Sequence, residues 1–127
     1  MQARPINSPS AVIPISGYAQ ALEIRNFERV LFISGQTPTD PAGDAAEGFE
    51  AQCRLAWQNI EAQLTAAGMT LDNVVMHRTY LADRRFALTN RAVRKEVLGS
   101  RTPACTVVVA GIFDEAWLVE IEAVAAA

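Results

Sequence analysis

The chain has 127 residues, of which half are hydrophobic and 20% are charged, with 11 Lys and Arg against 14 Asp and Glu. This length predicts one domain over residues 1–127, with enough apolar residues for a core. The net charge of −3 argues against a nucleic-acid partner, because such proteins bind phosphates through a basic surface, and no apolar run approaches the roughly 20 residues of a membrane span.

The N-terminal segment and the cysteines indicate the compartment. Residues 1–17 lack the apolar stretch and the small-residue cleavage site of a signal peptide. Cys53 and Cys105 are too few for a disulfide framework, and their spacing matches no zinc site. We therefore expect a cytoplasmic protein that makes no membrane contact.

The first half of the chain predicts two strands and a helix. Residues 18–24 are suited to an extended segment, and residues 29–34 form a β-rich run that stops at Gly35. Apolar residues then recur at three- and four-residue spacing over 48–67, which predicts a helix with one buried stripe that includes Cys53. Gly68 follows where a left-handed helix cap favours glycine.

The second half predicts a strand at 74–81, a helix at 86–98 that ends at Gly99, and strands at 104–110 and 116–124. The resulting order, β-β-α-β-α-β-β, predicts a two-layer α+β domain in which two helices cover one face of a mixed sheet. The other face would be left open.

The last strand places two carboxylates on that open face. Because side chains alternate along a strand, Val119 and Ile121 point to the helices while Glu120 and Glu122 point away. Two carboxylates held close together would raise the pKa of at least one, as in proton-donating pairs. The same pattern also fits a solvated sheet face. Association of subunits would cover the aliphatic residues of this face and leave the carboxylates in a cleft.

One local concentration of basic residues stands out, comprising Arg84, Arg85, Arg91, Arg94 and Lys95. Its spacing is typical of the solvated face of a helix rather than of a binding patch.

A series of short motifs runs along nearly the whole chain. They are Ser16-Gly17-Tyr18-Ala19-Gln20-Ala21, Leu31-Phe32-Ile33-Ser34-Gly35-Gln36-Thr37-Pro38, Ala51-Gln52, Asn59-Ile60, Ala66-Ala67-Gly68, Val74-Val75, Phe86 with Asn90, Pro103-Ala104 and Val119-Glu120-Ile121-Glu122-Ala123-Val124-Ala125. In their order and spacing these motifs resemble those of the reactive-intermediate deaminase (Rid, or YjgF-like) family.

This resemblance implies a chorismate-mutase-like fold, a homotrimer, and a small-molecule metabolite bound in clefts between subunits. Typical members hydrolyse 2-imino or enamine acids to 2-keto acids and ammonia, without a metal or an organic cofactor. Ribonuclease activity has also been ascribed to some relatives, and the acidic balance of this chain argues against it. A non-catalytic trimeric binding or regulatory protein that uses the same clefts is the alternative to an enzyme.

The resemblance also implies site residues. Glu120 matches the family's water-handling glutamate and Tyr18 its cleft tyrosine. Gly35 matches the glycine whose backbone approaches the substrate, and Asn90 the asparagine that opens the second helix. Local roles remain open as alternatives, since Gly35 is also typical of a strand end, Asn90 of a local cap and Tyr18 of an interface.

The chain departs from the family at Cys105, where deaminating members carry an arginine that grips the substrate carboxylate. Cysteine cannot make that two-pronged contact. Three explanations remain: another cation such as Arg101 substitutes, the substrate lacks a carboxylate, or the site is not catalytic. A nucleophilic role for Cys105 would need a depressed pKa, and neither its context nor the single histidine, His77, predicts one. A buried thiol and an ordinary strand histidine are the simpler interpretations.

Overall fold

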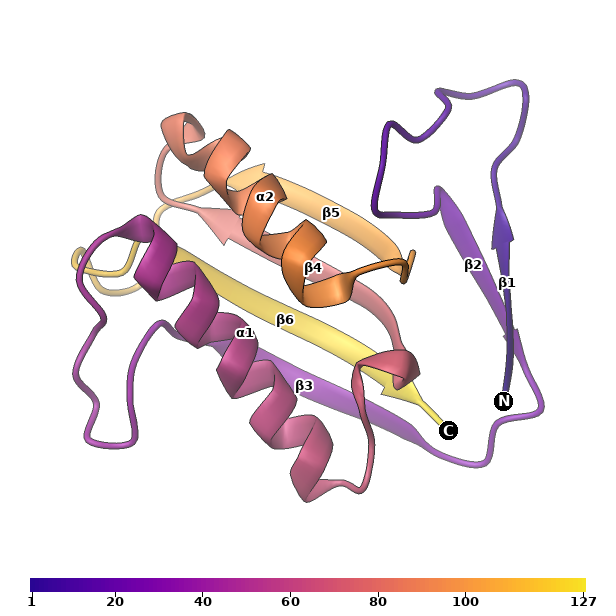
Figure 1. Cartoon of the computed structure of the whole chain (residues 1–127), viewed down its shortest axis with the longest axis horizontal. Helices are drawn as coiled ribbons and strands as arrows, with labels where there is room; N and C mark the ends of the chain where they lie inside the picture. The colour runs from indigo at the N-terminus through magenta and orange to yellow at the C-terminus, as the bar shows by residue number, and fades with distance from the viewer.

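Two helices lie on one face of a four-stranded sheet in the computed structural model, which describes residues 1–127 (Figure 1). The elements in chain order are β1 (Gln2–Ile6), β2 (Ala21–Arg25), β3 (Val30–Gln36), α1 (Phe49–Ala66), the 3-10 turn η1 (Leu71–Asn73), β4 (Val74–Leu81), the 3-10 turn η2 (Arg84–Phe86), α2 (Ala87–Leu98), β5 (Ala104–Val109) and β6 (Val119–Ala126). The α+β class with a mixed sheet is confirmed.

The main sheet has the strand order β3-β6-β4-β5. The last strand of the chain, β6, lies in the interior of the sheet and pairs antiparallel with both β3 and β4. The pair β4 and β5 is parallel, and α2 makes the crossover that a parallel connection needs. This topology puts β5 at one edge, beside α2, with β4 between it and β6.

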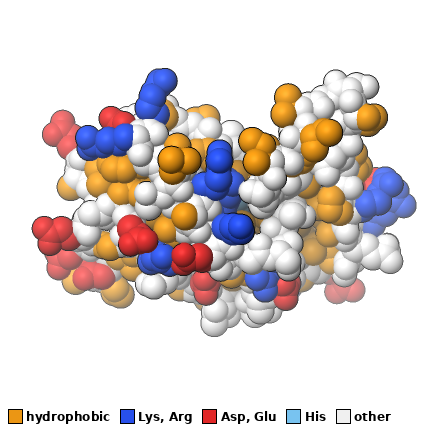
Figure 2. Space-filling view, turned by 45° about the horizontal axis from the view of Figure 1, so that its top comes forward, with side chains coloured by type: hydrophobic (Ala, Val, Ile, Leu, Met, Phe, Trp, Pro, Cys, Tyr) orange, Lys and Arg blue, Asp and Glu red, His pale blue; other side chains and the backbone are white.

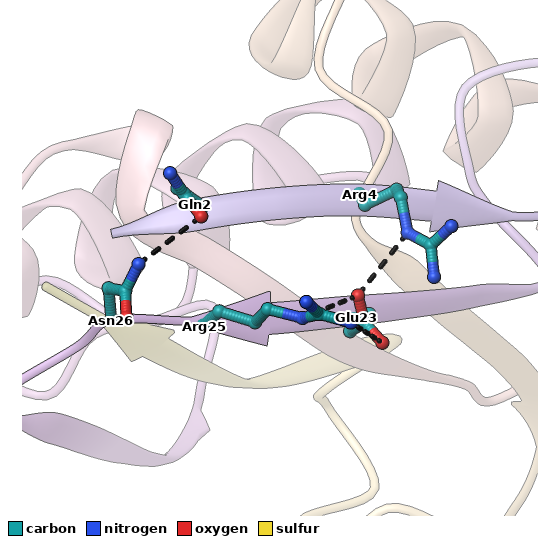
Figure 3. Close-up of polar contacts among 5 residues, drawn as sticks. All are labelled: Gln2, Arg4, Glu23, Arg25 and Asn26. Carbon is teal, nitrogen blue, oxygen red and sulfur yellow. Dashed lines mark hydrogen bonds and ion pairs between the residues drawn. The ribbon is translucent and has the colours of Figure 1, made fainter.

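The observed order contains one more strand than the sequence predicts. β1 pairs antiparallel with β2 in a separate two-stranded sheet. All five residues of β1 are exposed, so the strand has no alternation of apolar and polar residues by which sequence analysis recognises it. Polar side chains hold the pair together, with Arg4 and Glu23 3.2 Å apart and Asn26 donating to Gln2 over 3.2 Å (Figure 3).

The core lies between the helices and the inner face of β6. The buried stripe of α1 includes Cys53, Trp57 and Ile60, each at most 1% exposed, as the spacing predicts. These residues pack with alternate residues of β6 such as Val119 and Ile121 in one cluster. α1 ends as expected, because Gly68 follows it with a φ of +69°, a conformation that costs glycine little.

Two polar side chains of α1, the buried Gln52 and the half-buried Asn59, hold loops at the end of the sheet. The Gln52 amide donates to the carbonyls of Ala46 and Ala116 and accepts from the Leu118 N–H at 2.7 Å. Asn59 donates to two carbonyls of the loop that precedes α1. These two motif residues therefore hold the segment before β6 and the segment after β3 against α1, which is a structural role.

The face of the sheet opposite the helices is uncovered in the protomer. Phe32 is 79% exposed there, and a shallow hollow beside it is lined by Met76, Glu122 and Val124. Hydrophobic side chains also gather on the loop after β1, where Val12 and Ile13 are exposed (Figure 2, upper right). None of the helices has the length and apolar character needed to cross a bilayer.

Candidate functional site

A pocket of about 390 Å³ lies between α2, β5 and the segment that precedes β2. Its lining includes Tyr18, Asn90 and Cys105, three of the residues that the sequence predicts for a site. It also includes two residues that sequence reasoning did not assign to it, Arg91 and Arg94. The volume suits a small metabolite.

A backbone contact places the N-terminal side of this pocket. The Ala19 N–H donates to the Pro103 carbonyl at 3.2 Å, and Ala19 forms a parallel bridge with Ala104 at the start of β5. Tyr18 is thereby held next to the strand that carries Cys105. The predicted Tyr18 and Cys105 motifs, 87 positions apart in the chain, meet because of this bridge.

The guanidinium of Arg94 lies against the Cys105 thiol, with Nη1 donating to Sγ over 3.3 Å. Burial raises the pKa of Cys105 above its ordinary value, and the charge of Arg94 offsets this only in part. Cys105 is therefore a neutral thiol near pH 7, which does not favour a nucleophile.

The interpretation of the basic cluster as a solvated helix face is wrong for Arg94. This side chain is 7% exposed and points back toward β5, where its Nη1 meets Cys105. A signal for this placement was present in the sequence, because Arg94 follows Asn90 by four residues and so shares its helix face. The other residues of the cluster are not buried: Arg91, on the pocket rim, is exposed.

Asn90 is buried, 2% exposed, and its Oδ1 faces the thiol of Cys53 at 3.8 Å. Burial raises the pKa of Cys53 to about 12, so Cys53 stays protonated and is the donor in this contact. With Oδ1 occupied in this way, the amide N–H groups of Asn90 are the ones left for a ligand.

His77 is a fully buried core residue rather than part of the pocket. Its ring packs edge-on against Trp57, with centroids 5.1 Å apart, and neither ring nitrogen has a hydrogen-bond partner. Burial, and then the charge of Arg94, lower the pKa of His77 to about 4. His77 is therefore neutral near pH 7, as an ordinary strand histidine would be.

Glu120 and Gly35 meet on the open face of the sheet. A Cβ added at Gly35 would lie 2.9 Å from Cδ and 3.1 Å from Oε2 of Glu120. The pairing of β3 with β6 is irregular between Ile33 and Gln36, so Gly35 sits at a bulge, where glycine permits close approach. Because glycine has no side chain, position 35 leaves the space that the carboxylate of Glu120 occupies.

The second carboxylate of β6 is already engaged. Tyr80 donates to Oε1 of Glu122 at 2.6 Å, and Arg78 lies 3.2 Å from the same oxygen. The hydrogen bond from Tyr80, and then Arg78, lower the pKa of Glu122. The pKa of Glu122 is therefore lowered rather than raised, and Glu122 is not the carboxyl of the pair for which a raised pKa was expected. Glu120 takes part in none of the ion pairs or side-chain hydrogen bonds of the protomer, so it is the free carboxylate of the pair.

The predicted site residues thus fall into two groups on opposite faces of the sheet. Cys105 is in register with the buried His77 and contacts α2, so it faces the helices. Glu120 is in register with Tyr80, on the open face. β4 also lies between their strands. Within one protomer, Glu120 does not line the pocket that holds Tyr18, Asn90 and Cys105.

Arg101 belongs to neither group. Its Nε lies 2.7 Å from Asp72, and its Nη1 donates to the Leu98 carbonyl. It lines hollows near η1 and the start of β1 rather than the pocket at Cys105. The cation beside Cys105 in the protomer is therefore Arg94.

The polar groups of the pocket do not suit a metal ion. No three His, Cys, Asp or Glu side chains are grouped to hold one, and the guanidinium, amide and phenol of Arg94, Asn90 and Tyr18 are not the ligands that hard or borderline cations prefer. They suit an organic anion with hydrogen-bond acceptors.

Comparison with known proteins finds relatives over nearly the whole chain. The family described as Endoribonuclease L-PSP matches residues 8–127. A RutC family protein of Pyrococcus horikoshii is 37% identical over 122 residues, which is 94% of each chain. The 2-iminobutanoate/2-iminopropanoate deaminase of Bos taurus is 33% identical, covering 94% of this chain and 87% of that one.

A solved structure shares the whole fold. The Rid-family protein YyfB of Yersinia pestis, described as of unknown function, matches all of both chains with a TM-score of 0.87 and 25% identity. Relatives of this chain therefore include a protein named as an imine deaminase and one to which no activity is given.

Proposed function

This chain belongs to the Rid (YjgF-like) family, and on that premise we propose that it hydrolyses a small imine or enamine metabolite in clefts between subunits of a homotrimer, with Glu120 handling the water. The observation that carries the proposal is the pocket that gathers Tyr18, Asn90 and Cys105. Residues that the family resemblance marks from distant parts of the chain converge there, around a volume that suits a small metabolite.

The reaction is addition of water to a C=N bond. The water oxygen bonds to the imine carbon and one water proton moves to the nitrogen, which gives a carbinolamine. The remaining hydroxyl proton then moves to the nitrogen as the C–N bond breaks, which gives a carbonyl and ammonia. An enamine enters the same route after protonation at carbon. A carboxylate that takes the proton from water and returns it to nitrogen serves both steps, and Glu120 is the free carboxylate on β6.

A second protomer is needed to bring the two groups together. The pocket lies on the helix side of the sheet edge, while Glu120 lies on the open face. That face exposes Phe32, and apolar surface of this kind is what subunit association covers. In the proposed trimer the open face of one subunit lies against the pocket of the next, so that each cleft receives a pocket and a Glu120 from different chains.

A second candidate function is a trimeric small-molecule-binding or regulatory protein that uses the same clefts. The observation in its favour is the same separation, because the pocket of one protomer is lined without any contribution from Glu120. In that case a ligand would bind, and no chemistry would follow.

A coupled assay tests the proposal. An amino-acid oxidase generates 2-imino acids in situ, and release of the keto acid is followed with and without the protein. We expect acceleration by the wild type and its loss in Glu120→Gln, by about a hundredfold or more, since general acid–base catalysis contributes roughly 10²–10⁴-fold.

Glu61→Gln is the matched control, because Glu61 is an exposed carboxylate on α1 that does not line the pocket at Cys105, and its removal should leave the rate unchanged. If the wild type does not accelerate keto-acid release but binds a ligand saturably, the proposed enzyme is rejected in favour of the binding protein. Equal rates for Glu120→Gln and wild type would remove Glu120 from the chemistry.

A further inference from the structure

We propose that Arg94 of α2 is the group that binds the substrate's carboxylate, and that the site therefore takes a small carboxylate rather than a neutral imine. This inference rests on the proposed function for the reaction, although not for the binding. It assigns to a helix residue the role that position 105, now a cysteine, cannot fill.

The first argument is the unbalanced charge of Arg94. A guanidinium stays protonated in proteins, and burying a charge without a counter-ion is costly. Arg94 is 93% buried by its 7% exposure, yet none of the six ion pairs of the chain includes it. A fold that keeps an unpaired buried cation at a pocket wall is arranged for an anion that arrives with the ligand.

The second argument is the unused hydrogen-bonding edge. Nη1 donates to Cys105, while Nε is buried and has no partner. Gly17 lies over the other edge of the guanidinium, where a Cβ at that position would be 3.8 Å from Nε and 3.9 Å from Nη2. Glycine at 17 leaves that edge without a side chain against it. Nη2 also makes no hydrogen bond within the protomer and is not among the buried atoms, so the guanidinium keeps a donor for a carboxylate.

The third argument is that Cys105 and His77 fit this role for Arg94. An arginine at position 105 would bring a second guanidinium to within a few ångströms of the first, whereas a neutral thiol accepts the Nη1 contact and orients the group. His77, in register with Cys105, stays neutral because burial and Arg94 lower its pKa to about 4. Beside Cys105 the pocket wall therefore holds one buried positive charge, Arg94, positioned by neutral neighbours, while Arg91 lies exposed at the rim.

The pocket limits the size of the anion. A volume of about 390 Å³ accommodates a small organic acid, with Tyr18 and the amide of Asn90 available to its polar atoms. The expected ligand is therefore a small 2-imino or 2-keto carboxylate. The competing occupant is the carboxylate of a neighbouring subunit, which would satisfy Arg94 permanently and leave no affinity for an added acid.

Titration calorimetry with product-like probes tests the assignment. Pyruvate and 2-oxobutanoate would be compared with pyruvamide, the neutral isostere, on wild type, Arg94→Gln and Lys95→Gln. Lys95 is the matched control, since it is an exposed cation on the same helix that does not line the pocket. We expect keto-acid affinity to fall about tenfold to a hundredfold in Arg94→Gln, to stay unchanged in Lys95→Gln, and pyruvamide to bind weakly and equally throughout.

Two further variants keep the test decisive if Arg94→Gln perturbs folding. Arg94→Lys keeps the charge without the planar fork and should retain an intermediate affinity. The double variant Arg94→Cys with Cys105→Arg moves the guanidinium from helix to strand and should recover much of the binding that Arg94→Cys alone loses.

Several outcomes overturn the inference: no keto-acid binding by the wild type, equal binding of acid and amide, or affinity that does not change in Arg94→Gln. Keto-acid binding through Arg94 without imine hydrolysis would support the inference and reject the proposed enzyme. Hydrolysis that is insensitive to Arg94→Gln would reject the inference and leave the enzyme standing.

Discussion

The helix side and the open side of the four-stranded sheet each carry one functional charge without a partner, and the two charges are of opposite sign. On the helix side, Arg94 is buried at the pocket wall and has no carboxylate. On the open side, Glu120 lies close to Gly35 and forms no ion pair, while Glu122 is bound by Tyr80 and Arg78. One side is built to hold an anion, and the other to leave a carboxylate free.

This difference explains why one protomer does not hold a complete catalytic site. A pocket with a cation but no base can bind an acid without reacting with it, whereas a carboxylate on an open sheet can accept a proton but holds no substrate. Each side lacks what the other has. The two can act together only across a subunit boundary, because β4 and the thickness of the sheet separate them within one chain.

The largest effect expected on the helix side is a pH dependence of stability that comes from His77. Its pKa is lowered from 6.5 to about 4 by folding, so the unfolded chain binds this proton more readily and stability rises with pH between those values. The loss on moving from pH 7.5 to pH 4.5 should be roughly 2–3 kcal/mol from this group.

Urea unfolding of wild type and His77→Phe at pH 7.5 and pH 4.5 measures this loss of stability. The variant keeps an aromatic ring against Trp57 but cannot be protonated, so carboxylates that titrate in the same range cancel in the comparison. An equal loss of stability in both proteins would mean that His77 is not held neutral, and would contradict the description of Arg94 as a buried cation among neutral neighbours.

An intermediate effect is expected on the open side from Gly35→Ala. The added methyl group would meet the carboxylate of Glu120 at about 3 Å and displace it, while the flexible side chain absorbs most of the strain. Stability should change by less than about 1 kcal/mol, whereas hydrolysis should fall by about tenfold or more, because catalytic groups tolerate little misplacement.

A double-mutant cycle sharpens this test. Once Glu120 is replaced by alanine, Gly35→Ala should have no further effect on the rate, since the two residues act through one contact. An equal effect of Gly35→Ala with and without Glu120 would show that Gly35 serves the strand and not the carboxylate.

The smallest effect is expected from Tyr80→Phe, which removes the hydrogen bond from Tyr80 to Glu122. The hydrogen bond from Tyr80 is the main reason that the pKa of Glu122 is low. Without it, that pKa should rise toward 4.5, while the part due to Arg78 remains. Stability contributed by Glu122 is present above its unfolded pKa and is lost as pH falls, so the variant should differ slightly from wild type near neutral pH. Carboxyl resonances followed by NMR over a pH titration measure the change, and an unaltered Glu122 pKa would contradict it.

The sequence predicted the main sheet and its helices because their residues alternate or recur with clear periods. The stripe of α1 around Trp57 and the two faces of β6 around Glu120 are examples. β1 could not be predicted in this way, because all of its residues are exposed and its pairing with β2 depends on long-range hydrogen bonds.

The site was predictable only in part. Tyr18, Asn90 and Cys105 were marked by the family resemblance, and the structure brings them together. The compensating cation was sought next to Cys105 in sequence, at Arg101, but that residue pairs with Asp72. Arg94 reaches the site through the crossover of α2 over the sheet, a tertiary relation that neighbouring positions in the chain do not reveal.

Mixing of two inactive variants tests most directly the claim that each site joins the pocket of one chain to the Glu120 of another. Arg94→Gln and Glu120→Gln would be purified separately, then unfolded and refolded together in equal amounts, and imine hydrolysis measured per subunit. In a trimer assembled at random, about a quarter of the clefts receive an intact Arg94 from one chain and an intact Glu120 from the next. The account predicts recovery of about a quarter of wild-type activity in the mixture, with neither variant active alone. No recovery of activity in the mixture of the two inactive variants would place both residues in the same protomer's site and contradict the account.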